Sequence, residues 1–326
     1  WLKRRHKMSV AERSRSRSPN GPPGPPPGSA EADVLTAHRL RLAYGPPKQS
    51  KFRVASVLRF IRLDGTEGTI EAVNAEPHDA NIRGAICAER AALCQFQRDE
   101  ASRGSRISRC VCVTDSAKPF YPGPCCREFL LATCSPEVQV AVAGSAEPRE
   151  LSIISLGELL LLPSVYQGRG QDEIVSLGSA LGQKAAPPSE QQMASAFNAA
   201  VACARRQAKQ ASVFPVLFAA AVSFADGRVH VAAELKGIEY GCTVDAGSLL
   251  LTDMLRNREE GGAKAVCIVQ ADHFGVGHAP FASARSLLIE HGFGDVLTSA
   301  HDQHGAWAHP ISVRASLPHA DYSEML

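Results

Sequence analysis

The order of apolar and polar segments along the chain predicts a mixed α/β fold. Apolar runs bounded by turn residues are typical of buried strands, and apolar residues recurring every three or four positions are typical of helices. The N-terminal half has a predicted helix at 37–42, strands at 54–62 and 69–73, a helix at 86–96, a strand at 107–113, a helix at 127–131 and a strand at 138–142. This order predicts a mixed sheet with helices packed against it.

The same order of elements returns in the C-terminal half. The predicted elements there are a helix at 194–210, strands at 216–223 and 228–233, a helix at 246–254, a strand at 265–270 and a helix at 282–290. Individual residues also recur, because Pro122 and Arg127 reappear 158 residues later as Pro280 and Arg285. We therefore predict two copies of one domain in this chain.

Composition sets the boundaries of these two domains. Residues 1–30 are rich in basic residues, Ser and Pro and contain few apolar residues, so we expect a disordered arm there. Residues 168–192 are rich in Gly, Ser, Gln and Pro, which is typical of a linker. The predicted domains are therefore residues 31–167 and residues 193–326.

Charge is unevenly distributed between the arm and the rest of the chain. The first 20 residues carry seven Lys or Arg and one acid, so they contribute +6 to a total of +2 and leave −4 for the remainder. A folded part with a negative balance argues against general nucleic-acid binding through its surface. We expect a cytoplasmic protein with a solvated arm; an arm that directs the chain to an organelle is the alternative.

Apolar stretches and cysteines narrow the class of protein further. No apolar stretch reaches the ~18–20 residues that a membrane span needs, so no membrane partner is expected. The chain has 10 cysteines, of which seven fall within 48 residues. Without a visible secretory signal, this cluster predicts a reducing compartment and a metal site rather than a disulfide framework. The seven are Cys87, Cys94, Cys110, Cys112, Cys125, Cys126 and Cys134.

Two short motifs carry candidate chemistry. Cys87-Ala88-Glu89 begins one predicted helix, and the run Pro-Gly-Pro-Cys-Cys-Arg-Glu at 122–128 begins the next. Together they resemble the signature of the zinc-dependent cytidine deaminase family, which has His or Cys, x, Glu on one helix and Pro-Cys-x-x-Cys on another. The resemblance covers most of residues 35–142. It implies two tandem cytidine deaminase-like α-β-α sandwich domains, each with a mixed five-stranded sheet flanked by helices.

The resemblance implies a zinc site and a proton carrier. Cys87 and Cys126 would hold Zn²⁺ at two helix N-termini, where the positive end of the helix stabilises a thiolate, and Cys125 is an additional candidate ligand. Glu89 would move protons between water, the N3 atom of the base and the leaving ammonia. The implied reaction is the hydrolytic deamination of cytidine or deoxycytidine to the uracil nucleoside, a step of pyrimidine salvage.

A second set of residues resembles the substrate-binding part of the family. Val-Asn-Ala-Glu at 73–76 is similar to its Asn-x-Glu motif, and Lys-Phe-Arg-Val at 51–54 is similar to its opening helix-to-strand turn. By this resemblance Asn74 and Glu76 would hold the sugar hydroxyls, and Phe52 would pack on the base. The expected partner is thus a small-molecule nucleoside.

The chain departs from the family pattern in both halves. Gly123 stands where the first of the family's two neighbouring cysteines is expected, and it has no side chain to bind a metal. In the second copy Asp245 and Gly247 replace the ligand and the glutamate, and Phe281 and Ala284 replace both cysteines. We therefore expect no catalytic zinc in the second copy and interpret it as a structural partner that completes the first copy's pocket, with the tandem chain forming a homodimer.

Two other functions remain open from the sequence. Gly123 and the altered second copy favour a catalytically inactive deaminase-fold protein that serves as a structural or assembly subunit. The basic arm favours an enzyme that edits polynucleotides, although the Asn74 and Glu76 motif and the negative balance of the body argue against it. Zinc content separates an enzyme from an inactive subunit, and activity on free cytidine separates nucleoside from polynucleotide substrates.

Overall fold

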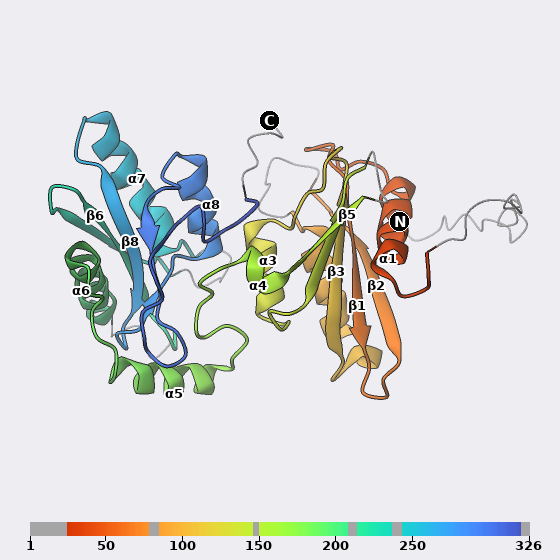
Figure 1. Cartoon of the computed structure of the whole chain (residues 1–326), viewed down its shortest axis with the longest axis horizontal. Helices are drawn as coiled ribbons and strands as arrows, with labels where there is room; N and C mark the ends of the chain where they lie inside the picture. The colour runs from red at the N-terminus through yellow and green to blue at the C-terminus, as the bar shows by residue number, and fades with distance from the viewer. Residues whose placement is uncertain (1–24, 78–84, 146–149, 208–213, 237–242, 321–326) are drawn as a thin grey trace, which may run out of the picture.

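The computed structural model describes residues 25–77, 85–145, 150–207, 214–236 and 243–320 (Figure 1). Within these residues the chain forms two mixed sheets, one of five strands and one of six, each flanked by helices. The predicted α/β fold class, with a mixed sheet in each half, is confirmed. None of the described helices is both long and apolar enough to cross a membrane.

The first half is built around the five-stranded sheet. Its elements are α1 (Ala30–Ala43), β1 (Val54–Ile61), β2 (Glu67–Val73), α2 (Ala88–Arg98), the 3-10 helix η3 (Glu100–Ser102), β3 (Arg106–Thr114), α3 (Pro124–Leu131), β4 (Gln139–Ala143), β5 (Leu151–Ser155) and α4 (Leu156–Leu159). The strand order is β2-β1-β3-β4-β5; β3 and β4 run parallel and the other pairs antiparallel. Helix α3 forms the crossover between the parallel strands.

Strand β1 is covered by helices on both faces. Leu58 and Phe60 belong to the apolar cluster that includes residues of α2 and α3, whereas Ala55 and Val57 belong to the cluster beneath α1. Successive side chains of a strand point to opposite faces, so this nearly continuous apolar run buries both. Helices α2 and α3 therefore share one face of the sheet, and that face carries the candidate site.

The second half repeats this arrangement with one strand more than the expected five. The elements after β5 and α4 are α5 (Gln171–Gly182), which lies within the predicted linker, then α6 (Gln191–Arg206), β6 (Phe218–Phe224), β7 (Val229–Ala233), α7 (Ala246–Glu259), β8 (Ala265–Asp272), β9 (Gly277–His278), α8 (Ala282–Glu290), β10 (Leu297–Thr298) and β11 (Ile311–Ser312). The strand order is β11-β10-β8-β6-β7, with β9 paired to β8. The additional strand arises at a turn: the Asp272 carboxylate accepts hydrogen bonds from the N–H groups of Gly275 and Val276, both 2.9 Å, and folds the chain back along β8.

The two halves share details beyond the order of elements. In each half a helix connects two parallel strands, α3 between β3 and β4 and α8 between β8 and β10. An isolated antiparallel bridge precedes the next helix in each half, Ala75 with Ile86 before α2 and Leu235 with Val244 before α7. These details are what two copies of one domain would produce.

Two buried arginines join the halves. Helices α3 and α8 pack against each other between the two sheets (Figure 1), and each contributes one arginine. Both arginines donate from Nε to the carbonyl of the proline five residues earlier, at 2.7 Å for Arg127 and 2.6 Å for Arg285. Their Nη atoms then donate to carbonyls across the interface, those of Pro318 and His319 for Arg127 and those of Leu161 and Leu162 for Arg285. The contacts are reciprocal, so each half anchors the other.

Candidate active site

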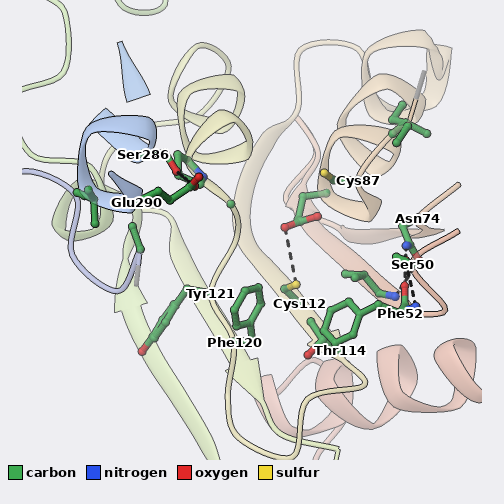
Figure 2. A pocket seen from close by; sticks show the side chains of 18 of the residues that line it. Ser50, Phe52, Asn74, Cys87, Cys112, Thr114, Phe120, Tyr121, Ser286 and Glu290 are labelled. Carbon is green, nitrogen blue, oxygen red and sulfur yellow. Dashed lines mark hydrogen bonds between the residues drawn. The ribbon is translucent and has the colours of Figure 1, made fainter. Parts of the chain in front are cut away.

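A cavity of about 1210 Å³ lies beside the N-terminal ends of α2 and α3 (Figure 2). Its first-half lining includes six residues that the sequence motifs single out, and the second half contributes Ser286, Ile289, Glu290 and His291 from the end of α8 and the residue after it. The six are Phe52, Asn74, Glu76, Cys87, Glu89 and Gly123. The cavity is therefore closed by both halves of the chain.

Three of the predicted residues come together, and two of them, Cys87 and Glu89, line this cavity. One ligand atom from each of Cys87, Glu89 and Cys126 lies within 4.8 Å of the other two. Cys87 is the N-cap of α2, Glu89 lies in the first turn of that helix, and Cys126 lies in the first turn of α3. Two helix N-termini thus point their positive ends at one group of two sulfurs and a carboxylate.

The electrostatics of this group favour one thiolate and one proton-exchanging carboxyl. A hydrogen bond from the Cys126 thiol lowers the pKa of Cys87 below its ordinary value, and Arg90 Nη2 donates to the Cys87 sulfur from 3.5 Å. The Cys126 thiol that donates this bond has its own pKa raised. Burial and the nearby Cys87 charge raise the pKa of Glu89 to about 7, and this side chain is only 3% exposed. These shifts favour the thiolate form of Cys87 and the protonated form of the Glu89 carboxyl.

Glu89 makes an unexpected contact with Cys112, which lies on β3 below it. The Cys112 Sγ is 3.8 Å from Oε1 of Glu89, a contact that Figure 2 draws as a dashed line. The other oxygen, Oε2, is buried and has no hydrogen-bond partner among the described residues. The sequence alone predicts Cys112 to be a small buried apolar residue. Its spacing of two residues from Cys110 on one strand indicates that both side chains point to the same face of β3, the face that α2 and α3 cover.

Gly123 leaves space where a third protein ligand is expected. It is the N-cap of α3 with φ −60° and ψ 158°, a conformation open to any residue, and an added Cβ would meet nothing within 4 Å. Cys125, the additional candidate ligand, is exposed and does not belong to the group of Cys87, Glu89 and Cys126. A metal at this group would therefore have two sulfur ligands, and Gly123 would supply none.

The two residues of the predicted substrate motif are held by the chain segment before β1. Asn74 accepts a hydrogen bond from the N–H of Val54 at 2.8 Å and donates one to the carbonyl of Phe52 at 2.9 Å. Glu76 accepts from the N–H of Ser50 at 2.9 Å and from its hydroxyl at 2.5 Å. Burial opposes ionisation of Glu76, but these hydrogen bonds hold its pKa below the usual range. Both side chains are fixed on the cavity wall, and Glu76 is an anionic acceptor there.

An aromatic pair forms another part of the wall. Phe52 and Phe120 stand edge to face with ring centroids 6.3 Å apart, and both line the cavity. Figure 2 shows Phe120 and Tyr121 together on the segment that leads into α3. Sequence reasoning did not single out Phe120, although its position two residues before Pro122 was the available signal.

The corresponding place in the second half is filled by protein. Asp245 caps α7 and accepts hydrogen bonds from Ser248 N–H at 2.9 Å, Ser248 Oγ at 2.7 Å and Ser283 Oγ at 3.2 Å. At Gly247, the position that matches Glu89, an added Cβ would lie 2.9 Å from the Cβ of Ala284. A glutamate at position 247 would therefore require Ala284 to move.

Comparisons with known proteins give matches only among solved structures. No protein-family model and no curated protein matches the chain. The cytidine deaminase from Burkholderia pseudomallei is 24% identical over 41% of this chain and 98% of that protein, with a TM-score of 0.34. The cytidine deaminase from Mycobacterium leprae is 20% identical over 36% and 93%, with a TM-score of 0.29, and that from Bacillus anthracis is 18% identical over 40% and 85%, with a TM-score of 0.28. At such scores these likenesses decide neither the family nor the activity.

Proposed function

We propose that the chain is a zinc-dependent hydrolase that deaminates cytidine or deoxycytidine to uridine or deoxyuridine. The observation that carries this proposal is the group of Cys87, Glu89 and Cys126, whose ligand atoms lie within 4.8 Å of one another and of which Cys87 and Glu89 line a cavity. Thiolates are preferred zinc ligands, and a carboxylate beside them but free to move protons is what hydrolysis requires. The tandem arrangement, with an inert second copy closing the pocket and the chain forming a homodimer, belongs to the same proposal.

The residues present fit a zinc ion through two sulfurs. Cys87 and Cys126 would hold it as thiolates. The Oε2 atom of Glu89 is buried and has no hydrogen-bond partner among the described residues, and a buried polar atom normally has a polar neighbour, so a bound group beside it would satisfy it. A zinc ion bound there supplies a Lewis acid that lowers the pKa of water to ~7. Because Gly123 has no side chain to bind a metal, we expect weaker retention of the metal than three sulfur ligands would give.

Glu89 is suited to move protons during the reaction. Burial raises the pKa of the Glu89 carboxyl, which favours a group that can both accept and return a proton. We assign it the transfer from the attacking water to N3 of the cytosine ring and the later transfer to the leaving ammonia. Burial keeps bulk water from supplying that proton instead.

The cavity walls provide groups for a nucleoside. The Glu76 carboxylate can accept hydrogen bonds from sugar hydroxyls, and the Asn74 amide retains one N–H and one lone pair beyond its backbone contacts. Phe52 and Phe120 offer apolar ring surface on which a pyrimidine can pack. These contacts support a free nucleoside as the substrate.

The test is zinc content per chain together with the absorbance change from cytidine to uridine, on the wild type and on Glu89→Gln. The substitution keeps the size of the side chain but removes its proton-carrying oxygen, so we expect unchanged zinc and a rate at least ~100-fold lower. Zinc near one per chain with turnover abolished by Glu89→Gln supports the enzyme. Turnover that survives the substitution contradicts the role of Glu89.

One observation favours a second candidate function. Gly123 removes a metal ligand from a position where the structure has room for one. A chain that binds no zinc and turns over no cytidine under the same assay would be a catalytically inactive subunit with a structural or assembly role. The same measurement therefore decides between the two functions.

A further inference from the structure

A buried thiol lies directly against the carboxylate of Glu89 and has no role in the proposed reaction. Cys112 is 1% exposed and lines the cavity from β3, and its Sγ is 3.8 Å from Oε1 of Glu89. Among the described residues, no other side chain makes a hydrogen bond to this carboxylate. The contact therefore restricts how the Glu89 side chain can rotate.

We propose that Cys112 is a positioning residue whose S–H donates to Oε1 of Glu89 and so directs Oε2 toward the reacting atoms. This proposal rests on the proposed function of Glu89 as the proton carrier. A thiol is a weak donor, and its long hydrogen bond fixes a direction without binding the carboxylate tightly. The carboxylate can then exchange its proton while its orientation stays defined, which a proton carrier needs.

The neighbouring thiol on the same strand provides an internal comparison. Cys110 lies two residues before Cys112, so both side chains point to the same face of β3. Cys110 is also fully buried, but its sulfur contacts the hydroxyl of Ser56 at 3.8 Å rather than Glu89. The two cysteines share burial and the face of the strand, whereas only Cys112 contacts Glu89 and lines the cavity, so Cys110 is the control for loss of a buried thiol from this face.

The second half shows what becomes of this strand position when the carboxylate is missing. Cys112 pairs with Ser56 across β1 and β3, and Gln270 pairs with Ala220 at the equivalent place across β6 and β8. There Gly247 replaces the glutamate, and both polar atoms of the buried Gln270 side chain lack a hydrogen-bond partner among the described residues. The residue at this strand position thus contacts a carboxylate in the first half, where Glu89 is present, and has no hydrogen-bond partner among the described residues in the second half, where Gly247 takes its place.

The kinetic test compares Cys112→Val with Cys110→Val in the full chain. Valine keeps the volume and removes the S–H donor, so losing one weak hydrogen bond should lower kcat by about three- to tenfold in Cys112→Val. KM should stay within about twofold, because positioning of Glu89 affects the chemical step rather than substrate binding. Cys110→Val should leave both constants unchanged. Equal kcat values for the two variants, or a change confined to KM, would overturn the proposal.

An infrared measurement tests the hydrogen bond without relying on turnover. The S–H stretching band lost in Cys112→Val identifies the Cys112 thiol in the wild type. Removing the acceptor with Glu89→Ala should move that band to higher frequency, while the band lost in Cys110→Val should stay in place. A Cys112 band that does not move refutes the contact even if the enzyme is active. If the wild type turns over no cytidine, the proposed function fails, and this band still decides whether the thiol holds Glu89.

Discussion

Replacing Gly123 with cysteine should add a third sulfur ligand to the proposed zinc site. Gly123 has ordinary helix-cap dihedral angles, and an added Cβ meets no atom within 4 Å, so the Cβ of a cysteine enters without a steric cost. Binding free energies of roughly 10–16 kcal/mol for four-ligand zinc sites correspond to about 3 kcal/mol per ligand. We therefore expect Gly123→Cys to tighten zinc binding by about 100-fold, since 1.4 kcal/mol is a factor of ten.

The assay is a competition for zinc between the protein and a chromophoric chelator at fixed pH, with Gly123→Ala as the matched control. Alanine adds the Cβ without a donor, so it should leave zinc affinity unchanged and raise the free energy of unfolding by about 0.5 kcal/mol through the unfolded chain. Substitution of Co²⁺ provides a second readout, because sulfur-to-metal charge-transfer absorbance should increase by half when two thiolates become three. Equal zinc affinity for the cysteine and alanine variants would refute the placement of the metal beside Gly123.

Two further predictions concern stability. Arg285→Leu leaves the carbonyls of Leu161 and Leu162 without their donor, so the free energy of unfolding by urea should fall by about 3 kcal/mol. The control is Arg258→Leu, which removes an arginine nearer the surface and should lower the free energy of unfolding by under ~1 kcal/mol. Equal losses for the two variants would contradict the anchoring role of Arg285. Burial lowers the pKa of His301 to about 4, so the folded state favours the neutral imidazole. As pH falls from ~6.5 toward 4, the unfolded chain takes up this proton and the folded chain does not, so the free energy of unfolding decreases over that window. The wild type should lose about 2 kcal/mol more than His301→Gln over that window in pH-dependent urea titrations, and parallel curves would contradict this assignment.

Most of the helices and strands could be predicted from short stretches of sequence, because apolar periodicity and turn residues within those stretches determine them. The strand from Val54 and the helix from Ala282 lie close to the predicted positions, since apolar periodicity and turn residues mark them directly. Helix α1 begins at Ala30 rather than near 37, because Ser29 caps its first turn and Glu31 and Asp33 favour the positive end of the helix. The two-residue strand β9 was missed because it depends on a turn held by a carboxylate rather than on an apolar run.

The candidate site was predictable only as far as its motifs extend along the chain. The grouping of Cys87, Glu89 and Cys126 followed from a resemblance between motifs, and the role of each residue stays a prediction. The contact of Cys112 with Glu89 depends on the register of β3 beneath α2, which no short stretch of sequence specifies. The contribution of α8 to the cavity depends on how the halves pack together, a long-range property of the fold.

The wall supplied by α8 has a consequence for how the cavity is assembled. When a separate subunit completes a pocket, the fraction of complete pockets depends on protein concentration and falls on dilution. Here the second half is covalently attached, so its effective concentration at the first half is set by the connecting segment and not by the amount of protein present. Each chain therefore carries a cavity that both of its halves close at any dilution, and α8 supplies part of that wall.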